Sequence, residues 1–234
     1  MKIRIAAICG AALVLSACGD SADNEAALNA PTREEVAAAE MNEQPEGPYA
    51  PAERCGELED FDLFLGDLRR AVIRRNTQGL IDITDENVRL DFGGSGGVDT
   101  LRSRLDEDPE LWTELNDTVA LGCSTDGPDS ASFPSLYGNL PDGMDPATTF
   151  LVTGNAVPVY AEANASSEQV GTIGWDLVQS ETGEGAGDFV AITTKDGKEG
   201  FIAADDLRST MDYRLLANRM DNGEWKMTAF IAGD

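Results

Sequence analysis

The chain has 234 residues, with 43 acidic against 17 basic side chains and a formal net charge of −26 at pH 7. So negative a chain repels nucleic acid, because nucleic-acid binding depends on Lys and Arg side chains that neutralise phosphates. The chain contains no histidine, which excludes a Ser-His-Asp or Cys-His nucleophile system and a His-ligated zinc site. The charge either maintains solubility or attracts basic partners and divalent cations.

The start of the chain predicts an export signal. Lys2 and Arg4 precede an apolar run at 5–14. This run is too short to span a bilayer, since a span needs roughly twenty residues. The run is followed by Leu15-Ser16-Ala17-Cys18, which resembles the lipobox of bacterial lipoproteins. The resemblance implies that residues 1–17 are a signal peptide that is removed and that Cys18 is lipidated. The alternative is a plain secretory signal in which Cys18 is incidental.

The likeness to lipoproteins also implies a location. Gly19, rather than Asp, follows Cys18, which in enteric bacteria directs a lipoprotein to the outer membrane, facing the periplasm. Removal of residues 1–17 leaves 15 basic against 43 acidic side chains. We therefore expect the protein to be attached to the membrane through its lipid and not through anionic headgroups.

A tether and a folded module follow. Residues 18–53 contain many Glu, Asn, Pro and Gly residues and few apolar residues other than alanine. This composition predicts a disordered tether without a core. We expect an α+β module at 54–124 with these elements: helices at 61–72, 80–83, 98–105 and 111–121 and a strand at 87–92.

The first helix of this module has the clearest pattern. Its apolar residues recur at i, i+4, i+7 and i+11, the spacing of one helix face: Phe61, Leu65, Leu68 and Val72. Acidic residues gather at its start and arginines at its end, an order that complements the helix dipole: Glu57, Glu59, Asp60, Asp62, Arg69, Arg70, Arg74 and Arg75. The arginines form either an anion site or an exposed helix end.

The module also contains a glycine-rich stretch and two cysteines that can pair. Gly93-Gly94-Ser95-Gly96-Gly97 fits the pattern of a nucleophile elbow, but Ser95 has no histidine to activate it, so we interpret the stretch as a turn. Cys55 and Cys123 are the cysteines outside the signal and the lipid site. In an oxidising compartment they favour a disulfide; the alternative is two separate buried thiols.

Residues 125–148 are rich in Asp, Gly, Pro and Ser and predict a linker. Short strands and turns then occupy 149–208, which resemble a bacterial SH3-type domain, a small β-barrel of cell-envelope proteins. The likeness is carried by Val157-Pro158-Val159-Tyr160, the run 166–173, Phe189-Val190-Ala191-Ile192, the run 196–202 and Asp205-Asp206-Leu207. It implies a ligand-binding barrel, often for peptidoglycan peptides and rarely catalytic.

Three aromatic residues of this segment are candidates for lining a ligand groove: Tyr160, Trp175 and Phe201. Aromatic side chains of small barrels otherwise belong to the core. A C-terminal β-hairpin is predicted at 209–234, because Asp221-Asn222-Gly223 separates two apolar runs. We hypothesise that this hairpin packs on residues 54–124.

The sequence thus predicts an α+β protein: an N-terminal module, a small all-β SH3-like barrel and a closing hairpin. No catalytic residue, cofactor or metal site is predicted. The expected function is that of a lipid-anchored envelope protein that binds peptidoglycan or a periplasmic protein. An acidic inhibitor or scaffold that captures a basic periplasmic protein is the alternative. A cell-wall hydrolase is disfavoured by the absence of histidine and of a Cys-based motif.

Overall fold

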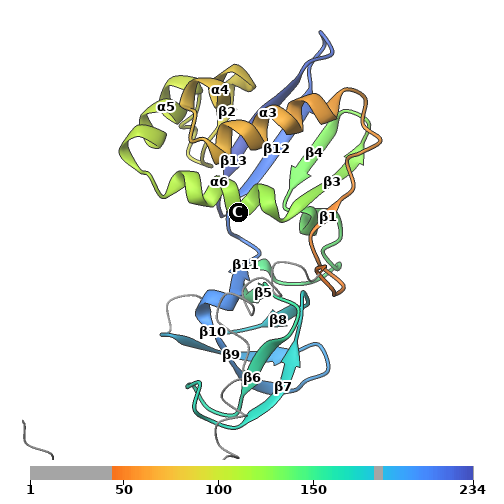
Figure 1. The fold of residues 1–234 in the computed structure, drawn as a ribbon, viewed down its shortest axis with the longest axis vertical. Helices are drawn as coiled ribbons and strands as arrows, with labels where there is room; N and C mark the ends of the chain where they lie inside the picture. Colours follow the sequence, from red (N-terminus) through yellow and green to blue (C-terminus); the bar gives the residue numbers. More distant parts are fainter. Residues whose placement is uncertain (1–43, 182–186, 234) are drawn as a thin grey trace, which may run out of the picture. The chain divides into compact units, whose positions relative to one another are not determined.

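The computed structural model describes residues 44–181 and 187–233, so the signal peptide and the lipidation site predicted at Cys18 lie outside the described residues. The described part contains four α-helices and two β-sheets, which confirms the predicted α+β class (Figure 1). Among the described residues, no helix is long and apolar enough to cross a membrane. Pro45–Asp234 form one compact unit.

The first sheet has six strands in the order β1-β3-β4-β12-β13-β2. The pairs β1–β3 and β13–β2 are parallel, and the other neighbours are antiparallel. The strands are β1 (Ala52–Glu53), β2 (Thr84–Arg89), β3 (Gly122–Gly127), β4 (Ser130–Phe133), β12 (Arg214–Arg219) and β13 (Trp225–Ile231). The C-terminal hairpin β12–β13 therefore lies inside this sheet, between β4 and β2 (Figure 1).

The helices cover one face of this sheet. They are α3 (Phe61–Ile73), α4 (Thr77–Asp82), α5 (Val98–Glu107) and α6 (Leu111–Ala120). Phe61, Leu68 and Val72 of α3 are buried in the core that α3 shares with the sheet, whereas Leu65, the fourth residue of the predicted apolar face, is only partly buried. The Phe61 ring meets the Trp225 ring edge-on at 4.9 Å. Each large apolar side chain buried in this way contributes about 1.5–3 kcal/mol.

The segment 125–148 is not the linker that the sequence predicted, because it contains β4. Ala131 and Phe133 of β4 face the core, and Phe133 is fully buried. Ser130 and Ser132, on the other face, are partly exposed. Two short 3₁₀ helices, Ser135–Gly138 and Pro146–Thr148, complete the segment. Four alternating residues between turn residues are enough for a strand once β3 and β12 pair with them.

The end of the predicted tether is also ordered, because residues 45–53 belong to the compact unit. β1 pairs with β3, with Ala52 opposite Gly122. Gly122 has φ +74°, and a Cβ there would lie 2.4 Å from the Ala52 carbonyl oxygen, so only glycine allows this approach. Immediately beyond β1, Cys55 forms the predicted disulfide with Cys123.

The second sheet has seven strands in the order β11-β5-β8-β9-β10-β6-β7, all antiparallel. They are β5 (Thr149–Val152), β6 (Val157–Tyr160), β7 (Gln169–Ile173), β8 (Leu177–Gln179), β9 (Phe189–Thr194), β10 (Glu199–Ala203) and β11 (Leu207–Ser209). Its core consists of Phe150, Val152, Val157, Val159, Val178, Val190, Ile192 and Ile202.

The barrel predicted from the SH3 likeness is not closed. The strand order has two ends, β11 and β7, which are not paired with each other. Four of the five residues of β7 are exposed, and only Ile173 packs partly against the core. Because β7 buries so little apolar surface, hydrophobic burial does not draw it into a closed cylinder.

Candidate functional site

The three aromatic residues predicted to line a groove do not come together. Tyr160 and Phe201 lie opposite each other on β6 and β10, and the Tyr160 ring meets the Phe189 ring edge-on at 5.7 Å. Trp175 lies between β7 and β8 in a different cluster, with Leu136, Leu151 and Leu177. Tyr160, Trp175 and Phe201 therefore do not line one groove, as the sequence predicted they would.

Trp175 is held by the polar groups around it. Its indole Nε1–H donates to Asn155 Oδ1 at 3.0 Å, and its backbone N–H donates to the Gly154 carbonyl oxygen at 2.9 Å. The carbonyl oxygen of Trp175 accepts from Tyr49 N–H at 2.8 Å. Trp175 thus connects the ordered start of the compact unit to the second sheet, and its side chain packs against Leu136, Leu151 and Leu177.

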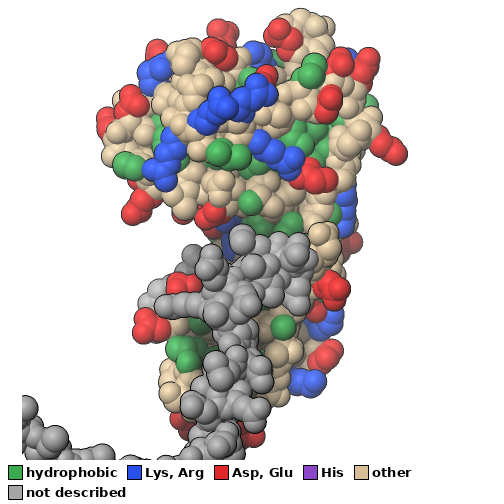
Figure 2. All heavy atoms as spheres, viewed as in Figure 1, with side chains coloured by type: hydrophobic (Ala, Val, Ile, Leu, Met, Phe, Trp, Pro, Cys, Tyr) green, Lys and Arg blue, Asp and Glu red, His purple; other side chains and the backbone are tan. Residues whose placement is uncertain are grey.

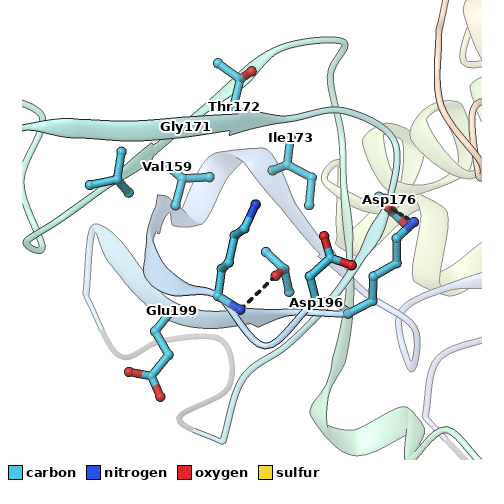
Figure 3. A pocket seen from close by; sticks show the side chains of 11 residues that line it. Val159, Gly171, Thr172, Ile173, Asp176, Asp196 and Glu199 are labelled. Carbon is cyan, nitrogen blue, oxygen red and sulfur yellow. Dashed lines mark hydrogen bonds and ion pairs between the residues drawn. The ribbon is translucent and has the colours of Figure 1, made fainter.

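A cavity of about 220 Å³ lies elsewhere on the second sheet (Figure 3). One wall is formed by β6 and β7, and the other by the β9–β10 turn and the start of β10. Figure 3 shows Val159 and Ile173 pointing toward the cavity, and Thr172 and Glu199 pointing away from it. The lining residues are Val159, Val170, Gly171, Thr172, Ile173, Asp176, Thr194, Lys195, Asp196, Lys198 and Glu199.

The turn that forms one wall is fixed by its own hydrogen bonds. Thr194 N–H donates to the Lys198 carbonyl oxygen and Gly197 N–H to the Thr194 carbonyl oxygen, both at 2.9 Å. Lys198 N–H donates to Thr194 Oγ1 at 3.1 Å. Gly197 has φ +76°, a conformation that glycine adopts without steric cost. The Asp-Gly pair therefore fixes the backbone from which the two flanking lysines extend.

The two lysines of the turn have different surroundings. Lys195 Nζ lies 2.7 Å from Asp176 Oδ2, and this hydrogen bond raises the pKa of Lys195. Lys198 Nζ has no carboxylate within 4.0 Å in the part of the chain that the structure describes. Its ammonium is thus available to an anionic group of a ligand.

The cavity combines this charge with an apolar wall. Val170 is 54 % exposed, one of four large apolar side chains so exposed among the described residues, and Val159 and Ile173 lie beside it. The chain has only four lysines, two of which line this cavity, although its net charge is strongly negative. The two lysines around the Asp-Gly turn are the part of the site that leaves a signal in the sequence.

The glycine-rich stretch that fits a nucleophile elbow lies outside this cavity. No group of three or more His, Cys, Asp or Glu residues that could hold a metal occurs among the described residues. The stretch Gly93–Gly97 forms a turn, in which Ser95 N–H donates to Asp91 Oδ1 at 3.0 Å. Asp91 in turn accepts from Arg104 at 2.8 Å, so the carboxylate nearest Ser95 holds the loop in place.

Comparison of the chain with models of protein families, with curated proteins and with solved structures finds no match. The likeness to SH3-type domains therefore stays a prediction from the sequence.

Proposed function

We propose that this chain is a non-catalytic lipoprotein of the bacterial envelope, anchored through Cys18 and facing the periplasm from the outer membrane. In this proposal the cavity of the second sheet binds peptide segments of peptidoglycan. One observation carries the proposal: Lys198, whose ammonium has no carboxylate within 4.0 Å among the described residues, lines the same cavity as the apolar side chains of Val159, Val170 and Ile173.

The ligand chemistry follows from these neighbours. A carboxylate would accept a charge-assisted hydrogen bond from Lys198, and a small apolar side chain would contact the valines. Peptidoglycan stem peptides carry both groups, because they combine alanine methyl groups with free carboxylates. A cavity of about 220 Å³ lies below the usual range for drug-sized ligands, so it suits one or two residues better than a saccharide.

Binding through so small a site is expected to be weak for a single peptide. The cell wall, however, presents the same peptide many times, and a lipid anchor keeps the protein next to it. Repeated weak contacts then act together as avidity. The proposed function is therefore attachment between membrane and cell wall, without any chemical step.

Co-sedimentation with purified sacculi tests this function. The chain from residue 19 onward retains the whole compact unit and should pellet with sacculi at both low and moderate salt. Lys198→Ala should reduce pelleting several-fold. Lys226→Ala is the matched control, because Lys226 is the lysine of the compact unit outside the cavity. Absence of pelleting, or equal pelleting of the Lys198→Ala and unaltered chains, would contradict the proposal.

The alternative function is capture of a basic periplasmic protein, and it is supported by the excess of 43 acidic over 17 basic residues. Such a complex depends on long-range attraction, so it should weaken sharply as salt screens the charges. Pelleting with sacculi that survives moderate salt distinguishes the wall-binding function from this alternative.

A further inference from the structure

A groove of about 720 Å³ lies between α3, the end of α4 and the β12–β13 hairpin. Its volume is within the range of ligand-binding clefts, which is about 300–1,000 Å³. The groove shares no residue with the cavity of the second sheet. It is therefore a separate surface, and what binds there does not depend on the binding of peptidoglycan.

One large apolar side chain of this groove is open to a ligand. Leu63 of α3 is 67 % exposed, and it lines the groove together with Phe64 and Trp225, which are each 5 % exposed. Contact between Leu63 and an apolar group of a ligand removes apolar surface from water, which is favourable. The charges around Leu63 then determine which ligand fits.

Four exposed carboxylates line the same groove, and the fold brings them there from separate elements. Asp60 immediately precedes α3, and Asp67 lies within this helix. Asp82 is the last residue of α4, and Glu224 immediately precedes β13. Figure 2 shows acidic side chains gathered where Figure 1 places the start of α3 and the tip of the β12–β13 hairpin. The apolar contact at Leu63 is therefore surrounded by negative charge.

The two basic side chains that line the groove are held by other groups of the protein. Arg219 forms a 2.8 Å ion pair with Glu59. Lys226 Nζ donates to the carbonyl oxygen of Asp82 at 2.7 Å and lies 3.9 Å from Glu224 Oε2. Neither of these cations is paired with the two carboxylates that α3 and its start contribute to the groove.

Leu63 lies between those two carboxylates. Asp60, Leu63 and Asp67 follow one another in steps of three and four, the spacing of one helix face. The Asp60 carboxylate has neither an ion pair nor a cap hydrogen bond among the described residues. Asp67 is paired with Arg70 at 3.0 Å, but both side chains are more than half exposed, and such a surface pair contributes little. Both carboxylates can therefore receive a cation of a ligand.

We propose that this groove binds a basic segment of another protein, in which a large apolar residue is flanked by lysine or arginine residues. The apolar residue packs on Leu63, and the flanking cations donate charge-assisted hydrogen bonds to Asp60 and Asp67. These two positions are about 10 Å apart along the helix, a length that about three residues of an extended segment span. The net charge of −26 steers such a segment toward the protein.

A short synthetic peptide tests the ligand chemistry. It contains one leucine flanked on both sides by lysines and carries a fluorophore, and fluorescence anisotropy measures its binding to the chain from residue 19 onward. We expect saturable binding that weakens as the salt concentration rises. A control peptide with serine in place of leucine keeps the charge and should bind several-fold more weakly. Equal affinities of the two peptides, or no saturable binding at millimolar concentration, would overturn the proposal.

Two matched pairs of variants test the place of binding. Leu63→Gln should weaken binding several-fold, whereas Ile73→Gln should leave it unchanged, because Ile73 is 75 % exposed on the same helix but lies outside the groove. Asp60→Asn should also weaken binding several-fold, and Asp62→Asn, outside the groove, should not. Each pair removes the same group, so general attraction to an acidic protein changes equally in its two members.

The four variants are expected to fold, because all four positions are exposed and glutamine forms helices about as well as leucine does. Asparagine also tolerates the left-handed backbone of Asp60, with φ +57°. Circular dichroism verifies the fold of each variant. Control variants that lose as much affinity as their counterparts in the groove would contradict binding at this site.

Discussion

The indole Nε1–H of Trp225 donates a 2.8 Å hydrogen bond to the carbonyl oxygen of Glu59, a residue 166 positions earlier in the chain. Trp225 begins β13, and Glu59 lies just before α3. Arg219 of β12 reinforces the connection through a 2.8 Å ion pair with Glu59 Oε2. The C-terminal hairpin is therefore held against the start of α3. Its buried side chains belong to the same hydrophobic core as those of α3.

Replacement of Trp225 by Phe should lower the free energy of unfolding. The ring contact with Phe61 is largely kept, whereas the hydrogen bond to Glu59 is lost, which costs about 1–2 kcal/mol. Urea unfolding followed by far-UV circular dichroism measures the change. Trp112→Phe is the matched control, because Trp112 is equally buried and its indole nitrogen has no hydrogen-bond partner in the described part of the chain. Equal losses in the two variants would show that the bond to Glu59 contributes nothing.

Reduction of the disulfide should destabilise the protein strongly. Cys55 and Cys123 are separated by 68 positions, and a cross-link that closes a loop of this length contributes about 4 kcal/mol by restricting the unfolded chain. The urea midpoint of the oxidised chain is compared with that of the Cys55→Ser and Cys123→Ser double variant. A midpoint that does not change would contradict this prediction.

Glu114→Gln should stabilise the protein at neutral pH. Burial, followed by the charge of Asp212, raises the pKa of Glu114 above its ordinary value of 4.5. The folded chain then holds this proton more tightly than the unfolded chain does, so stability falls as pH rises from about the ordinary pKa through the raised one. Glutamine does not ionise and escapes this loss.

Thermal unfolding as a function of pH measures this effect. The Glu114→Gln variant should unfold at a higher temperature than the unaltered chain at pH 7, and the difference should vanish below pH 4.5. Glu168→Gln, at an exposed site, serves as the control for removing one negative charge. A stabilisation that persists unchanged into acid would be inconsistent with ionisation of Glu114 as its cause.

Trp175→Ala should weaken the fold and leave ligand binding intact. The side chain loses a hydrogen bond to Asn155 and its packing on Leu151 and Leu177. Because Trp175 is only half-buried, we expect a loss of about 2 kcal/mol, below the range for a fully buried Trp. Pelleting with sacculi, measured where the variant is folded, should equal that of the unaltered chain. Reduced pelleting of the folded variant would place Trp175 in the binding site.

The helices of the compact unit could be predicted because their signals are local. The apolar spacing of Phe61, Leu68 and Val72 requires no knowledge of what the helix packs against, and the structure has a helix at Phe61–Ile73. The same holds for α5 and α6, whose predicted bounds agree with the structure within two residues. The Asp-Gly pair at 196–197 is likewise a local signal, because this pair favours a tight hairpin turn.

The strands that the sequence did not indicate depend on distant partners. β4 has only two inward residues, Ala131 and Phe133, and pairs with β12 more than 80 positions later. β1 is joined to β3 through backbone groups beside Gly122, so its side chains carry no signal of the pairing. Composition around both strands is typical of loops, and only the assembled sheet makes them strands.

The candidate site was missed for a different reason. Aromatic residues were used to predict the groove, but the indole of Trp175 donates to Asn155 and packs in a separate cluster with Leu151 and Leu177. The lysines that line the cavity flank a turn that is recognisable in the sequence. Their role becomes apparent only when Val170 and Ile173 of β7 line the same cavity, and that arrangement depends on the distant pairing of β6 with β10 through Tyr160 and Phe201.

The most direct test of the proposed function is a titration of the isotope-labelled chain, from residue 19 onward, with a soluble peptidoglycan stem peptide, followed by ¹H–¹⁵N NMR. The account predicts saturable shifts of amides around the cavity, at 170–173 and 195–199, and their loss in Lys198→Ala. Shifts centred on Trp175 or on α3, or no shifts at millimolar peptide, would contradict it.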